Sequence, residues 1–460
     1  MSKQALSRRE FMRRVGLTGL GLALATTGCQ PQTVVVKETV PVPETVVAKE
    51  TVAVEVTAAP KEAITIRVHA RLGEQGDHFT FFAQKFNEEH RPDIFVKPEL
   101  FSNADYFQKL ATMIAGGTVG DGFWLYLGGG FQQYAASGVC APLDDIVAAE
   151  NYDLKQFFPE CVDVLRWKGS LFALPWSLHV GSAAGVYFNK KAFDDAKVPY
   201  PTPDWTWDDL IATAKSLTNT SKGQYGIAGS TYYAGTPASV VRSHGGDLIS
   251  QDGTKATLTD AKTREGLQIM SDLYNKWKVA APAGAITDFN QMFASGRIAM
   301  FESGYWGIQT KNYVPAEIFG IVPTPKGPTG RGNTLFVDMQ SVTKVSKHPR
   351  ETFMYYELLC SHEAGMDLWQ VRGSVPGARP DVWQSEAALK DENFRVYSDM
   401  VTKDGMPPAL PLPANFRENE YWSAMDTGLE SIWLAEKTLD QVIDAAQKAC
   451  QDVLDKPSLI

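Results

Sequence analysis

Alternating and helically spaced apolar residues begin at Ala63 and predict strands and helices in turn. Residues 64–69 alternate apolar and polar side chains, as a half-buried strand does, and residues 94–96 are expected to form a second strand. Between them we expect a helix after Asp77, whose apolar face consists of Phe79, Phe82, Ala83 and Phe86. The order of strand, helix and strand predicts a mostly parallel sheet covered by helices, in which ligands bind near the carboxyl ends of the strands.

The same alternation resumes after residue 200 and predicts a second α/β lobe. Thr206 and Asp209 have capping-box spacing, and Pro349 has the position of a first-turn proline. A strand is expected at 297–301. The helical faces of this region consist of Trp207, Leu210, Ile211, Ala214 and Leu217; of Phe289, Met292 and Phe293; and of Leu439, Val442, Ile443, Ala446, Cys450 and Val453.

The first 28 residues have the pattern of an export signal. A basic start is followed by an apolar run from Val15 to Ala25 that is too short to cross a bilayer. Residues 7–12, SRREFM, resemble the twin-arginine export consensus, with the general secretory route as the alternative. Residues 26–29 resemble a lipobox, which predicts cleavage before Cys29 and attachment of lipid to it.

Residues 29–62 are predicted to be a disordered tether. A loose six-residue repeat of Val, Thr, Glu and Pro contains no aromatic residue and therefore cannot build a core. A repeat of β-strands is the alternative, because alternating Val and Thr favour strands. At about 3 Å per residue an extended tether could hold a domain up to roughly 100 Å from the membrane.

Composition and charge exclude several classes of protein. Hydrophobic residues make up 44% of the 460 and charged residues 21%, which is typical of globular chains and excludes a wholly disordered protein. The first 28 residues carry a charge of +4 and the whole chain −9, so the remainder carries −13. Such an acidic chain, with no basic stripe, is not expected to bind nucleic acid.

Cysteine and motif spacing indicate no metal or cofactor. Cys140, Cys161, Cys360 and Cys450 have no Cys-x-x-Cys spacing, so we expect buried free thiols, with a Cys140–Cys161 disulfide as the alternative. The chain contains no Walker loop, no His-Glu-x-x-His and no Gly-x-Ser-x-Gly. We therefore expect no cofactor and no enzymatic activity, although glycosidase carboxylates would leave no local signature.

Several motifs in a fixed order resemble one known family. They are YFQKL with IAGG at 106–117, GVCAPL at 138–143, VYFNK at 186–190, PDWTWDDL at 203–210, FASGRIAM at 293–300 and PTPKGP at 323–328. From Ala63 to its end the chain resembles bacterial extracellular solute-binding proteins of the maltose-binding-like, sugar-type class, which serve ABC importers. It departs from them at residues 120–123, Gly-Asp-Gly-Phe, where such proteins usually have Pro-Asp followed by an apolar residue. It also departs at Gly128–Gly130, which replaces a polar binding position common in relatives.

The resemblance implies a two-lobed periplasmic-binding-protein-like fold (type II) with ligand between the lobes. Three crossings are expected near residues 174–185, 335–345 and 371–379. One lobe would comprise residues 63–176 and 342–374, and the other 177–341 and 375–460. The resemblance further implies a monomer outside the cytoplasm, held to the membrane by Cys29, that delivers its solute to the membrane subunits of an ABC permease.

Sugar binding requires flat aromatic rings and planar polar groups, and the sequence supplies both near the expected cleft. The aromatic candidates are Trp124, Tyr126, Trp176, Tyr232, Tyr305, Trp306 and Trp422. The polar candidates are Arg71, Glu74, Gln75, His179, Glu302, Asp338, Arg372 and Arg379. Asp338 is the strongest polar candidate, because a residue at a crossing faces the cleft whichever lobe carries it.

The ligand class stays open at this point between sugars and small polar solutes such as glycerol phosphate esters, since Arg71, Arg372 and Arg379 could form a basic pocket. An anchored glycoside-active enzyme and a purely structural surface lipoprotein are the alternatives from other classes.

Overall fold

The computed structural model describes residues 63–181, 184–229 and 235–460, all of which belong to one compact unit, Pro60–Ile460. The predicted export signal, the predicted lipidation site at Cys29 and the predicted tether lie outside the described residues. None of the helices within the described ranges is long and apolar enough to cross a bilayer.

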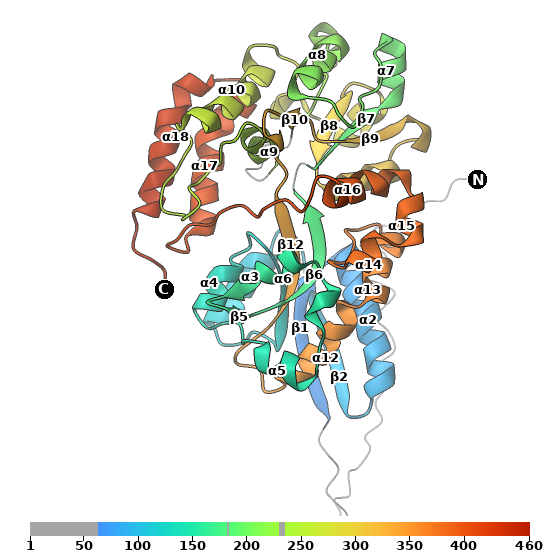
Figure 1. The fold of residues 1–460 in the computed structure, drawn as a ribbon, viewed down its shortest axis with the longest axis vertical. Coiled ribbons are helices and arrows are strands. Elements are labelled where there is room, and N and C mark those ends of the chain that lie inside the picture. The colour runs from blue at the N-terminus through green and yellow to red at the C-terminus, as the bar shows by residue number, and fades with distance from the viewer. Residues whose placement is uncertain (1–62, 182–183, 230–234) are drawn as a thin grey trace, which may run out of the picture. The chain divides into compact units, whose positions relative to one another are not determined.

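The first lobe is built on a five-stranded sheet of order β2-β1-β3-β12-β6. The predicted first strand, helix and second strand are present, although the helix begins at Glu74 rather than after Asp77, because Gly73 at φ 94° makes the turn. Helices α2 and α12 pack on this sheet (Figure 1). The elements are β1 (Ile64–Arg71), α2 (Glu74–His90), β2 (Ile94–Phe101), α3 (Tyr106–Ala115), β3 (Gly122–Tyr126), α4 (Phe131–Ala136), α5 (Asp144–Ala149), α6 (Pro159–Asp163), β4 (Arg166–Trp167), β5 (Ser170–Leu171), β6 (Leu174–Val180), β12 (Leu335–Val342), α12 (Pro349–Leu359), α13 (His362–Met366), a π-helical turn (Asp367–Val371) and α14 (Pro380–Trp383).

The second lobe is built on a three-stranded sheet of order β8-β7-β9. Helices α17 and α18 lie side by side next to α10 (Figure 1). The elements are β7 (Gly185–Asn189), α7 (Lys190–Ala196), α8 (Trp207–Leu217), α9 (Thr236–Ser243), α10 (Ala261–Asn275), α11 (Phe289–Ala294), β8 (Met300–Ser303), the 3-10 helix η4 (Tyr305–Asn312), β9 (Phe319–Pro323), β10 (Lys326–Gly327), β11 (Gly330–Arg331), α15 (Glu386–Lys390), α16 (Glu392–Thr402), α17 (Glu418–Trp433) and α18 (Leu439–Leu454), with short 3-10 turns at Leu154–Gln156, Thr220–Lys222, Ala283–Ala285 and Ala316–Ile318.

The expectation of mostly parallel sheets is wrong outside the first three strands. β1 pairs in parallel with β2 and β3, but β12 is antiparallel to β3 and to β6, and β7 is antiparallel to β8 and β9. The reason is that β12 enters the first sheet from the second lobe, so it runs against strands that follow the βαβ rule.

Local signals identified several boundaries correctly. The Thr206–Asp209 capping box starts α8, whose five predicted apolar residues are all buried. Pro349 is the first residue of α12, and the predicted face of α18 is buried in full. The strand expected at 297–301 is displaced to Met300–Ser303, because Ile298 makes only an isolated bridge to Tyr225.

The chain passes between the two sheets along its crossing segments. β6 of the first sheet leads to β7 of the second, and β9 leads back to β12. The segment 371–379 runs beside β6, where the Ala378 N–H donates to the Trp176 carbonyl at 3.1 Å. The α14 that follows still packs on α13, and contact with the second sheet begins at α16.

The buried apolar residues form two clusters. The larger contains the interior of the first lobe and extends to one face of the second sheet, and the smaller lies within the second lobe between α8, α10, α17 and α18. Cys140, Cys161 and Cys360 lie in the larger cluster and Cys450 in the smaller, and all four are buried free thiols.

Candidate functional site

The adjacent crossing strands β6 and β12 bring Asp338 against Ser177 and His179, which lie 161 and 159 residues earlier in the sequence. Asp338 is 4% exposed, and its Oδ2 accepts a hydrogen bond from Ser177 Oγ at 3.0 Å. The same oxygen lies 3.0 Å from His179 Nε2. The His179 ring lies 5.6 Å from the ring of Trp306, which belongs to the second lobe. Three predicted site residues, His179, Trp306 and Asp338, therefore meet where the chain crosses between lobes.

The first lobe contributes a second group of predicted residues. The Arg71 guanidinium lies 4.1 Å above the ring of Trp124 and donates to Gln75 Oε1 at 2.9 Å. Trp124 is only 1% exposed, and Tyr126 stacks against Phe336 of β12 with centroids 6.5 Å apart. The stacking and the hydrogen bond hold Arg71 in one position. Glu74 is partly exposed at the first residue of α2.

The second lobe contributes a buried carboxyl beneath an exposed indole. Glu302, on β8, is 3% exposed and accepts from Thr324 Oγ1 at 2.8 Å. Burial raises the pKa of Glu302 to about 7, although hydrogen bonds from Thr236, Thr324 and Ser239 oppose the rise. Trp306 is 41% exposed and lines a hollow together with Glu302. An exposed ring beside a buried polar group is an arrangement that suits a sugar.

Trp422 has a neighbour that sequence reasoning missed. Trp422 is 3% exposed and lines a narrow cavity with Glu418, Gly128 and Phe336, which brings α17 against β12 and the glycine loop of the first lobe. Burial raises the pKa of Glu418 to about 7, opposed by hydrogen bonds from Trp422 and the backbone of Gly130. The available signal was the spacing of four residues, which places Glu418 and Trp422 on one face of a helix.

Other predicted residues lie apart from this group. Trp176 is 2% exposed and packs on the rings of His78 and Phe79 in the interior of the first lobe. Tyr305 is 3% exposed and packs edge-on against Phe394 and Tyr397. These two rings therefore serve the packing of the core. Tyr232 lies outside the described residues.

Two of the predicted arginines are held in ion pairs. Arg372 Nε lies 3.1 Å from Asp367 Oδ2, and its guanidinium lies over the ring of Phe81. Arg379 pairs with Asp381 at 2.7 Å and also donates to Gln156. Neither arginine lines the hollow beside Trp306 or the cavity beside Trp422.

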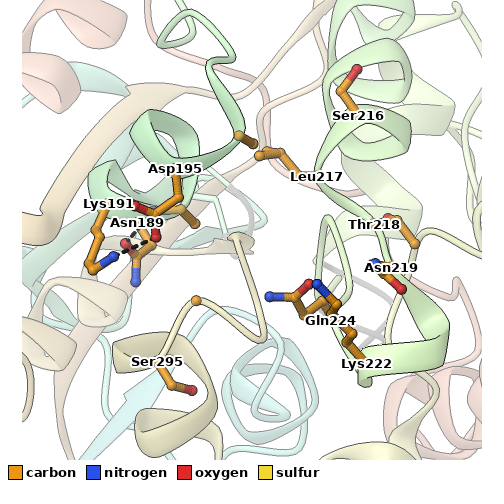
Figure 2. A pocket seen from close by; sticks show the side chains of 13 residues that line it. Asn189, Lys191, Asp195, Ser216, Leu217, Thr218, Asn219, Lys222, Gln224 and Ser295 are labelled. Atoms are coloured by element: carbon orange, nitrogen blue, oxygen red, sulfur yellow. Dashed lines mark hydrogen bonds and ion pairs between the residues drawn. The ribbon is translucent and has the colours of Figure 1, made fainter.

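A polar hollow elsewhere in the second lobe differs from this site. Figure 2 shows Asn189, Lys191 and Asp195, near α7, facing Thr218, Asn219 and Gln224. Lys191 and Asp195 form an ion pair within it. None of its lining residues is aromatic, and none is a predicted site residue, so the candidate site is the region around Asp338, Trp306 and Trp422.

The described ranges contain no group of three or more His, Cys, Asp or Glu side chains placed to hold a metal ion.

Comparison with known proteins gives consistent results. Residues 82–396 match a family described as bacterial extracellular solute-binding protein. The mannitol-binding protein of Pseudomonas aeruginosa is 33% identical over 145 residues, which are 31% of each chain. The sn-glycerol-3-phosphate-binding periplasmic protein of Escherichia coli is 24% identical over 414 residues, covering 82% of this chain and 89% of that one.

Solved structures share the fold. An ABC substrate-binding protein of Listeria monocytogenes, solved in complex with cycloalternan, superposes with a TM-score of 0.75 at 23% identity and covers 85% of this chain and 99% of that one. This likeness establishes the two-lobed fold. Because the family match spans more than half of the sequence, the chain belongs to the bacterial extracellular solute-binding protein family.

Proposed function

We propose that this protein is the substrate-binding lipoprotein of an ABC importer and that it captures an uncharged sugar or polyol between its lobes. The lobes would divide at the crossing segments, and lipid on Cys29 would hold the protein at the outer face of the cell membrane. Ligand that touches both lobes would favour the closed arrangement, from which a permease takes the solute.

The choice of ligand rests on which charged side chains have partners within the protein and which lie near the exposed Trp306 ring. Of the three residues that could bind a phosphate ester, Arg372 and Arg379 are paired with carboxylates, and Arg71 is held between the Trp124 ring and the Gln75 amide. Around the exposed Trp306 ring, Glu302 lines the same hollow, and Asp338 lies behind His179, whose ring is 5.6 Å from Trp306. Carboxyls and a flat ring suit hydroxyl groups and the apolar face of a sugar, whereas they would repel a phosphate.

Shifting lobe closure from 1:99 to 99:1 takes about 5.5 kcal/mol of differential affinity. Two or three hydrogen bonds to charged groups, at about 1.5–3 kcal/mol each, together with one stacked ring, can supply it. No catalysis is needed for this function, and the proteins with which this chain shares its family are binding proteins.

A thermal-shift screen tests the proposal. The probes are mannitol, erythritol, maltose, mannobiose and sn-glycerol-3-phosphate. At least one uncharged probe is expected to raise the melting temperature, whereas the phosphate ester is not. Trp306→Ala should abolish most of the shift because it removes the exposed ring. Incubation with the oligosaccharides should release no product, and turnover would show that the protein is an enzyme instead.

A further inference from the structure

Glu418 is a buried carboxyl at the point where the second lobe meets the glycine loop of the first. It lies in the first turn of α17 and is 6% exposed. The cavity beside it is lined from the first lobe by Leu127 and Gly128 and from β12 by Leu335 and Phe336. Glu418 therefore sits between the lobes rather than within one of them.

One oxygen of this carboxyl has no hydrogen-bond partner. Within the described residues, Glu418 Oε1 makes no hydrogen bond, although it is fully buried. The backbone N–H of Gly130 and the indole of Trp422 are hydrogen-bond donors to the carboxyl group, but neither carries a positive charge. Burying a carboxyl oxygen without a donor is costly, and a hydroxyl of a bound molecule would offset that cost.

The space beside Glu418 has the size of one hydroxyl group. The cavity measures about 10 Å³, which is room for roughly one water molecule. Leu410 and Leu412 complete an otherwise apolar wall. Gly128 at φ 106° and Gly130 at φ 85° hold the loop in a left-handed backbone conformation. Because glycine has no side chain, this loop places only backbone atoms beside the cavity. A hydroxyl on an apolar carbon fits this space, whereas a phosphate is too large and carries the wrong charge.

We infer that Glu418 is a specificity-determining residue that accepts a hydrogen bond from one hydroxyl of the ligand beside the Gly128–Gly130 loop. This inference rests on the proposed function, since it names the contact by which that site selects an uncharged sugar or polyol. It also explains how the chain can lack a polar side chain in the loop itself: the polar group is supplied by the opposite lobe.

The rival explanation is that Glu418 only fastens α17 to the Gly130 backbone. The two explanations differ in one readout. A ligand contact makes the effect of a Glu418 substitution depend on a particular hydroxyl of the ligand, whereas a fastening role weakens all ligands alike.

The experiment measures affinities by titration calorimetry for the wild type, Glu418→Gln and Glu418→Ala. Glu430→Gln is the matched control, because Glu430 is an exposed glutamate on the same helix. The ligand is the uncharged probe with the largest thermal shift, together with its singly deoxygenated analogues. At pH 8, where the Glu418 carboxyl is ionised, we expect Glu418→Gln to weaken binding about 10-fold, since a hydrogen bond to a charged acceptor becomes one to a neutral amide. The control variant should bind as the wild type does.

For one deoxygenated analogue, the affinity should fall about 10-fold in the wild type and hardly at all in Glu418→Ala. Unchanged affinity in both Glu418 variants, or an equal loss for every analogue, would overturn the inference and leave the proposed function standing. Failure of the wild type to bind any uncharged probe would overturn the proposed function, and the inference with it. Melting curves of the variants establish that they are folded.

Discussion

Buried carboxyls on the two sides of the candidate site have different neighbours. Asp338, on the crossing strand β12, faces an imidazole and a hydroxyl, each at 3.0 Å. Glu302, on β8 of the second lobe, is as deeply buried but is surrounded by the hydroxyls of Thr324, Thr236 and Ser239. The imidazole and the hydroxyl both contact Asp338 Oδ2 directly, whereas Glu302 Oε2 makes no hydrogen bond within the described residues. The Asp338 carboxylate is thus held by two direct contacts, whereas burial raises the pKa of Glu302 to about 7.

The largest effect is expected from removing the carboxylate of Asp338, which two buried side chains contact. Asp338→Ala would leave His179 and Ser177 buried without their shared acceptor. We expect a loss of about 3 kcal/mol in unfolding free energy, as for other buried pairs that lose one partner. Denaturant unfolding measures it. Asp338→Asn, which keeps an acceptor oxygen, should lose clearly less, and equal losses in the two variants would argue against the pairing.

A second prediction uses the raised pKa of Glu302. Its pKa is about 7 in the folded protein against 4.5 for an ordinary glutamate, so the folded state retains the proton longer than the unfolded state does. The stability that this proton contributes is complete below about pH 4.5 and is lost as the pH rises to about 7.

Glu302→Gln removes the loss of stability that ionisation of the buried Glu302 causes as the pH rises. Relative to the wild type, the variant should therefore gain roughly 3 kcal/mol between about pH 5 and pH 8. Unfolding measured at both pH values tests the difference, which cancels contributions from Glu418 because both proteins contain it. A constant offset between the two proteins at all pH values would show that Glu302 ionises normally.

The smallest effect is expected far from the site. Thr206 caps α8, where its side chain accepts from the Asp209 N–H and the Asp209 carboxylate accepts from the Thr206 N–H. Thr206→Ala should lower stability by about 1 kcal/mol, because a helix-capping hydroxyl is lost. The affinity for the best uncharged probe should not change. A change in affinity would mean that α8 takes part in ligand binding.

Local patterns predicted the fold better than the site. Capping at Thr206, Pro349 at a helix start and the face of α18 each depend on neighbours in sequence, so the chain alone specifies them. The antiparallel direction of β12 depends on the path of the chain between the lobes, which no local pattern contains.

The site required contacts that the sequence does not display. Asp338 and His179 are 159 residues apart, and only strand pairing reveals that they meet. Trp176 was an aromatic residue at a crossing, yet its alternate position on β6 turns it into the core against His78. The sequence predicts that Arg372 and Arg379 could bind a phosphate, but it does not reveal the carboxylates with which they form ion pairs. Glu418 was missed because its neighbour across the lobes is a glycine backbone.

The four buried cysteines of the described residues can report local unfolding of the two apolar clusters. Three thiols are sealed in the larger apolar cluster and one, Cys450, in the smaller. A thiol-reactive dye can reach each of them only when the surrounding packing opens. Mapping the modified peptides during mild denaturation would therefore reveal which lobe loosens first, without any engineered label.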